Sequence, residues 1–132
     1  MKKYNIHFDE NKNTVVLEFV SFLTLDEFKQ VWLESMHLIE VKKAPYFYID
    51  ASKERIIPPG SEEWLVSDFF PIAQQAAQRL GYRLKVARSE SEDIFNRLAS
   101  ERSINHFSSN NPNFDFQNFP SSEKALIWLY EV

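Results

Sequence analysis

One stretch of the chain gathers oxygen-bearing side chains where a strand gives way to a helix. Asp50, Ser52 and Ser61 all lie in residues 48–64, which read YIDASKERIIPPGSEEW. A carboxylate beside hydroxyls can bind a cation or orient another hydroxyl, and a helix N-terminus favours the charge of a phosphoserine. The same residue types also bond to nearby backbone N–H groups in turns and helix caps. The sequence leaves both interpretations open.

Several enzyme chemistries lack their residues here. The chain has no cysteine, which excludes disulfides, thiolate nucleophiles, zinc ribbons and iron–sulfur clusters. With two glycines in 132 residues, neither a P-loop nor a dinucleotide-binding fingerprint can be written. His7, His37 and His106 are not spaced as metal ligands, so we expect no metal site. A hydrolase pairing Ser61 with His106 would lack a recognisable orienting acid and oxyanion donor.

The aromatic content is the unusual feature of the composition. Aromatic residues make up 15% of the chain and include 12 phenylalanines, enough to fill a large core or to line an apolar pocket. Trp64 lies on a predicted amphipathic helix and is expected to pack. Phe69, Phe70, Phe114 and Phe116 are the rings that a pocket would use. They would bind a small apolar or lipid-like ligand.

Charge and length limit the partners. A net charge of −4 with scattered Lys and Arg disfavours nucleic-acid binding, which needs a basic surface. No apolar run reaches the ~18 residues of a membrane span, and the start MKKYNIHFDE turns polar before a signal-peptide segment develops. We therefore expect a cytoplasmic protein without a membrane span. At 132 residues, one domain with one real core is predicted.

Alternating apolar and polar residues, together with short apolar runs, predict the strands. Apolar residues at helical spacing, preceded by capping residues, predict the helices. The predicted strands are Tyr4–Phe8, Thr14–Phe19, Tyr46–Ile49, Tyr82–Ala87, and either Ile104–Phe107 or Phe114–Phe119. Thr24 with Glu27 caps a first helix of about 16 residues, which ends near Lys42 and Lys43. The other helices are predicted to begin after Ser61, after Ser91, and after Ser121 or Ser122. The helix that begins after Ser61 is predicted to be kinked at Pro71 and ended by Gly81.

This order predicts an α/β fold. An antiparallel hairpin opens a mixed, mainly parallel sheet of four or five strands flanked by about four helices. Ligands and partners of such sheets gather at the carboxyl ends of the strands. We therefore expect the end of the third strand, at Asp50, and the start of the next helix, at Ser61, to form one rim.

The element order and several strand ends resemble the STAS-like (anti-sigma-factor-antagonist-like) domains, and most closely the small stand-alone bacterial type. The resemblance rests on Tyr48-Ile49-Asp50, the loop into Pro-Gly-Ser-Glu-Glu-Trp64, Lys85-Val86-Ala87 and the ending Glu123-Lys-Ala-Leu-Ile-Trp128-Leu. It implies no cofactor, no catalysis, and regulation by protein–protein contact. In signalling members, a serine beside an aspartate at the start of the second helix is phosphorylated. Here Ser61 is the nearest equivalent, without the Asp-Ser pair.

The function expected from these observations is a non-enzymatic adaptor in bacterial signalling that recognises a protein partner. Its predicted binding residues are Asp50, Ser52, Arg55, Ser61, Trp64, Phe69, Phe114 and Phe116. The alternative is the carrier or sensor of a small apolar ligand described above. An exposed apolar patch on the folded chain would favour a homodimer.

Overall fold

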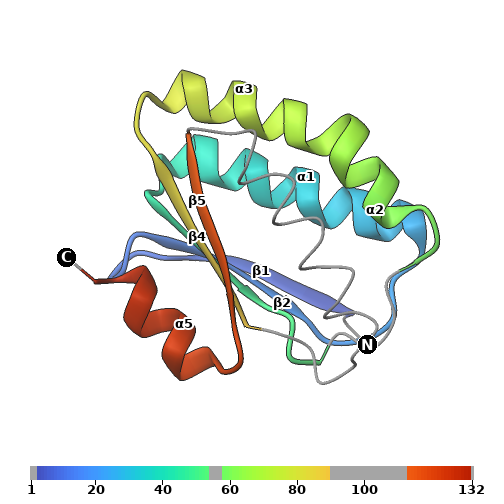
Figure 1. Cartoon of the computed structure of the whole chain (residues 1–132), viewed down its shortest axis with the longest axis horizontal. Helices are drawn as coiled ribbons and strands as arrows, with labels where there is room; N and C mark the ends of the chain where they lie inside the picture. The colour runs from blue at the N-terminus through green and yellow to red at the C-terminus, as the bar shows by residue number, and fades with distance from the viewer. Residues whose placement is uncertain (1–2, 54–57, 90–112, 132) are drawn as a thin grey trace.

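A five-stranded mixed sheet forms the centre of the molecule (Figure 1). The computed structural model describes residues 3–53, 58–89 and 113–131. The strands follow one another across the sheet in chain order, β1 and β2 antiparallel and all later neighbours parallel. Their bounds are β1 Tyr4–Asp9, β2 Thr14–Phe19, β3 Tyr46–Asp50, β4 Leu84–Ser89 and β5 Phe114–Phe119. The predicted α/β fold is confirmed.

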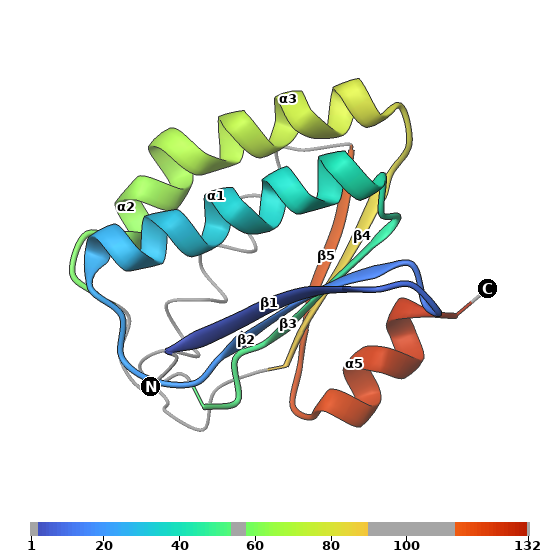
Figure 2. The same cartoon turned by 180° about the vertical axis from the view of Figure 1, so that it is seen from behind.

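The helices lie on both faces of this sheet, most of them on one (Figures 1 and 2). One face carries α1 (Leu25–Lys42) beside a longer rod made of α2 (Ser61–Trp64), η1 (Leu65–Phe69) and α3 (Phe70–Leu80). The opposite face carries α5 (Ser122–Leu129). From β2 to β4 each parallel strand is added on the same side of the previous one. Right-handed crossovers between such strands place their helices on one face of the sheet, which explains why α1 and the rod lie together.

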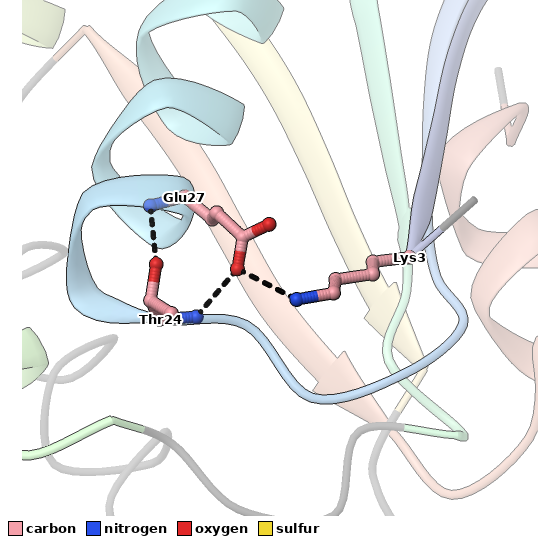
Figure 3. A network of polar contacts seen from close by, with 3 residues as sticks. All are labelled: Lys3, Thr24 and Glu27. Atoms are coloured by element: carbon pink, nitrogen blue, oxygen red, sulfur yellow. Dashed lines mark hydrogen bonds and ion pairs between the residues drawn. The ribbon is translucent and has the colours of Figure 1, made fainter. Parts of the chain in front are cut away.

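Polar contacts hold the turn between β1 and β2 and the start of α1. Asp9 closes the hairpin turn, because its Oδ1 accepts from the backbone N–H of Asn11 at 3.0 Å and of Lys12 at 3.3 Å. At the other end, the predicted capping box of α1 is present (Figure 3): Thr24 Oγ1 accepts from Glu27 N, and Glu27 Oε1 accepts from Thr24 N. Lys3 Nζ also donates to Glu27 Oε1 at 3.1 Å, which ties the start of the sheet to the start of α1.

The rod from Ser61 to Leu80 corrects two details of the prediction. Gly60, not Ser61, is the N-cap of α2, with a positive φ of 87° and no side-chain capping bond. The predicted single helix is divided into α2, η1 and α3, because just before Pro71 the chain widens into the π-helical turn η1, where Phe70 N donates to Leu65 O. Proline has no N–H and its ring crowds the carbonyl four residues back, so a wider turn accommodates it. Gly81 ends α3 with φ 78°, as predicted.

Strand and helix ends differ slightly from the prediction elsewhere. β4 begins at Leu84 and reaches Ser89, two residues later than expected, while Tyr82 Oη donates to Ala44 O at 2.9 Å. β5 is the second of the two alternatives offered for the last strand. Ser121 caps α5 by accepting from Lys124 N. The predicted helix after Ser91 lies outside the described residues, as do Ile104–Phe107, Arg55 and His106.

Two apolar cores stabilise the layers. The larger lies between the sheet and the α1–α3 layer, and the smaller lies under α5, around Tyr48, Ala87, Ala125 and Leu129. Leu17, Ile39, Ile49 and Leu84 of the larger core are fully buried; the remaining buried members include Val15, Phe19, Phe28, Val31, Trp32, Met36, Phe47, Phe69, Phe70, Ala73, Val86 and Phe114. None of the helices in residues 3–53, 58–89 and 113–131 is both long and apolar enough to span a bilayer.

Candidate functional site

Asp50 is the centre of a hydrogen-bond cluster at the carboxyl end of β3. Its Oδ1 accepts from the hydroxyl of Ser52 at 2.6 Å, from the backbone N–H of Ser52 at 3.1 Å, and from the hydroxyl of Ser89 at 3.2 Å. Ser89 lies beside Asp50 because β3 and β4 are parallel and their register places these two residues opposite each other. Asp50 is half-buried and Ser52 exposed.

The buried hydroxyls of Tyr48 and Ser89 form a hydrogen-bond chain that ends at this carboxylate. Ser89 is 1% exposed, and its Oγ accepts from the Tyr48 hydroxyl at 3.3 Å. Burial raises the pKa of Tyr48, while hydrogen bonds to Ser89 and Ser122 act in the opposite direction. A phenol with a raised pKa stays neutral at physiological pH and keeps its proton for donation. We call Tyr48, Asp50, Ser52 and Ser89 the Asp50 rim.

A second carboxylate lies next to the Asp50 rim. Glu18 pairs with Asp50 in the register of β2 and β3, and with Asn5 in that of β1 and β2. Asn5 Nδ2 donates to Glu18 Oε1 at 3.1 Å. The strands thus align two acidic side chains on the α5 face of the sheet. Within the described residues no three acidic or histidine side chains group as a metal site requires.

The opposite face of the same sheet end carries a buried cation that sequence reasoning missed. Arg88 is 3% exposed, and its Nη1 donates to Asn118 Oδ1 at 3.2 Å on β5. The Nδ2 atom of Asn118 is buried and has no hydrogen-bond partner among the residues that the structure describes. The sequence did carry a signal for this cation. Arg88 and Ser89 are the last two residues of the buried strand β4, at the carboxyl edge of the sheet.

The structure does not bring Ser61 to Asp50. Both lie towards the carboxyl ends of the strands, but Asp50 faces α5, whereas Ser61 starts the rod on the other face. The single rim expected from the sequence is therefore divided by the sheet. Ser61 is 1% exposed, and its hydroxyl donates to Pro58 O at 2.6 Å. Phosphorylation of Ser61 would require this helix start to open.

The aromatic residues predicted to bind a ligand lie in or against the larger core. Trp64 is half-buried, with its ring 5.6 Å from that of Phe69 and 6.4 Å from that of Phe28. Phe69 and Phe114 are each 4% exposed, and Phe116 packs against the core from β5. The apolar cavity that these rings share with Trp32, Met36, Phe47 and their neighbours measures about 20 Å³. That is room for about one water molecule.

A larger hollow lies on the surface of the rod. It is open, measures about 720 Å³, and is lined by Gly60, Glu62, Glu63, Val66 and Ser67. Its two glutamates lie in the first turn of α2, where the helix dipole favours negative charge. That placement accounts for them as helix-stabilising residues.

Comparison of the chain with protein-family models, with curated proteins and with solved structures gives no match in any of the three.

Proposed function

We propose that this chain is a non-enzymatic regulatory or adaptor domain of the STAS-like type, which recognises a protein partner in bacterial signalling through the Asp50 rim. The observation that carries the proposal is the Asp50 carboxylate, held by three donors, two from the exposed Ser52 and one from Ser89 at the end of β4. Such a group is pre-ordered before a partner arrives, which lowers the entropy cost of binding. The element order and the opening hairpin agree with the STAS-like resemblance.

Charge supports recognition of a cationic or hydrogen-bond-donating surface. Glu18 lies beside Asp50 on the neighbouring strand, so the partner faces two carboxylates. Electrostatic complementarity of this kind raises association rates and selects among partners. A lysine, an arginine or a row of backbone N–H groups would match it.

The hydrogen bonds of the two serines favour recognition over nucleophilic chemistry. Ser52 and Ser89 both donate to the same oxygen of Asp50. An activated serine needs a base that a third group orients towards it, and a carboxylate shared by two hydroxyls and a backbone N–H serves neither as a dedicated base. The arrangement instead holds the carboxylate still.

Site-specific photocrosslinking in the native host tests this proposal. A photoreactive amino acid replaces Ser52 in the Asp50 rim; the matched control carries it at Gln75, which is exposed on α3 of the opposite layer. We expect a discrete crosslinked partner from position 52 that is absent from position 75. The further substitution Asp50→Asn should reduce its yield severalfold, because it removes the charge and keeps the side-chain shape.

Equal crosslinking from both positions, or a yield unchanged by Asp50→Asn, would contradict recognition at the Asp50 rim. A lipid-sized adduct on the purified chain in native mass spectrometry would favour the apolar-ligand alternative instead. The small cavity around Phe69 and Phe114 gives that alternative little room among the described residues.

A further inference from the structure

The first strand leaves one edge of the sheet without a partner strand in the described part of the chain. β1 is the outermost strand and pairs only with β2. Figure 2 shows β1 along this edge, with α1 above it. An open strand edge presents a row of backbone N–H and C=O groups that another strand can bind.

The register determines which residues direct these groups outward. Val20 N donates to Lys3 O at 2.8 Å, so the backbone groups of Lys3 point towards β2. In an antiparallel pair the direction alternates from residue to residue. Asn5, His7 and Asp9 therefore also point inward. Tyr4, Ile6 and Phe8 point their N–H and C=O groups outward.

We propose that this edge binds β1 of a second copy of the same chain, antiparallel and with Ile6 on the two-fold axis. Two five-stranded sheets then become one continuous sheet, and the α1–α3 layers of both copies lie on the same face. In this register Ile6 faces Ile6 and Tyr4 faces Phe8. Each of these pairs is of the hydrogen-bonded kind, so every outward-pointing N–H and C=O of the three residues finds a partner.

The side chains of β1 complement themselves in this register. Tyr4 and Phe8 form an aromatic pair on the helical face, and Asn5 and His7 form a polar pair on the other face. At the ends, Lys3 of one copy faces Asp9 of the other. Aromatic pairs and opposite charges placed directly across a sheet stabilise it. Lys3 retains its bridge to Glu27, since an ammonium group has three donors.

Neighbouring registers fit less well. A two-fold axis perpendicular to the sheet must pass midway between a residue and its copy in the other chain, so the nearest alternatives centre on Asn5 or His7. Centring on Asn5 sets Lys3 against His7 and leaves the outward groups of Phe8 beyond the pairing of β1. Centring on His7 pairs Ile6 with Phe8 but leaves Tyr4 outside β1. The centre at Ile6 uses the whole strand.

The surface beside the edge can receive the second copy. A hollow of about 360 Å³ lies there, lined by Lys3, Tyr4, Asn5, Ile6 and Glu34. Val41 is 60% exposed and follows Glu34 by seven residues along α1, so it lies on the side of the helix that faces this edge. Pairing of β1 would bring the two α1 helices together and shield this apolar side chain.

This inference does not depend on the proposed function, because β1 is at the sheet edge and the Asp50 rim lies on β3 and β4. Sedimentation of the full chain over a range of concentrations gives the first test. We expect a reversible increase from the mass of one chain to that of two. A single-chain mass at every concentration would overturn the proposal.

Cysteine trapping tests the register, because the natural chain has no cysteine. In the double variant Asn5→Cys, His7→Cys, the two positions form non-hydrogen-bonded pairs across the two-fold axis, with Cα atoms about 4.5 Å apart, within disulfide range. We expect mild oxidation to convert most of it into a covalent dimer. The matched control Asp115→Cys, Gln117→Cys repeats this spacing on β5, the other edge strand, and should stay largely uncrosslinked.

Each outcome decides the question. Wild-type dimers that β1 cysteines fail to trap, or equal trapping at β5, would contradict pairing through β1. Circular dichroism of both double variants shows whether they are folded before oxidation. If the β1 variant does not fold, Val41→Glu replaces it: this exposed site tolerates the charge, and the dimer should dissociate at concentrations several-fold higher than for the wild type. An unchanged dimer would then overturn the model.

Discussion

At the scale of single residues, the Asp50 rim combines one buried and one exposed hydroxyl on the same carboxylate oxygen. Ser89 is enclosed between Tyr48 and Asp50, whereas Ser52 lies in the following loop at the surface. Removing a buried partner leaves another polar group unsatisfied, but removing an exposed one lets water replace it. The two serines should therefore differ in what they contribute to stability.

We predict that Ser89→Ala lowers the free energy of unfolding by about 1–2 kcal/mol, because the Tyr48 hydroxyl loses a buried acceptor and Asp50 loses a donor. Ser52→Ala, its matched control, should change that free energy by less than about 0.5 kcal/mol. Urea unfolding of the three proteins measures both effects. Equal losses for the two variants would show that Ser89 is not the buried support described above.

At the scale of elements, the rod on the helical face depends on two glycines and a widened turn. Gly60 and Gly81 begin and end it with positive φ values of 87° and 78°. A Cβ on Gly60 would come no closer than 3.5 Å to Leu25 Cδ2, and one on Gly81 would meet nothing within 4 Å. Both sites therefore require glycine for backbone conformation, and steric crowding contributes little.

Gly60→Ala and Gly81→Ala should each lower the free energy of unfolding by about 1 kcal/mol, because an L residue is disfavoured in the left-handed region. The expected equality is the informative part, since the two sites differ in crowding but share the backbone strain. Thermal unfolding of each variant gives the comparison. A much larger loss at Gly60 alone would mean that contact with Leu25 at the start of α1 dominates.

At the scale of the whole molecule, the strand order lacks the reversal at which open α/β sheets bind their ligands. Ligands of open α/β sheets bind where the strand order reverses and the adjacent helices go to opposite faces. Here the strands run from β1 to β5 in chain order without a reversal. Among the described residues, the aromatic side chains fill the core between the sheet and the α1–α3 layer.

Phe69→Ala should destabilise the fold by about 3–5 kcal/mol, since the ring is buried against Trp32 and Phe70. Phe22→Ala is the matched control, because Phe22 is 56% exposed and its loss should cost less than about 0.5 kcal/mol. Denaturant unfolding measures the pair. A stable Phe69→Ala protein would identify that ring as the lining of a binding pocket and would revive the apolar-ligand alternative.

The sequence predicted the local elements because their signals are local. Thr24 with Glu27 predicted the start of α1, Gly81 predicted the end of α3, and strand-helix alternation predicted the mixed sheet. The same signals predicted Asp50 and Ser52 as site residues. They could not show that Ser61 is buried, because a serine after glycine reads as a helix cap whether or not another helix covers it.

The sequence by itself determined the types of elements, their order and the absence of cysteine chemistry, since propensity, capping and composition need no distant contacts. Only the tertiary structure decided that Ser89 meets Asp50, that Ser61 lies on the other face, and that β1 has no second partner strand among the described residues. Each of these depends on strand register and on the face to which a side chain points. A shift of one residue in pairing reverses that face, and the linear pattern does not record the pairing.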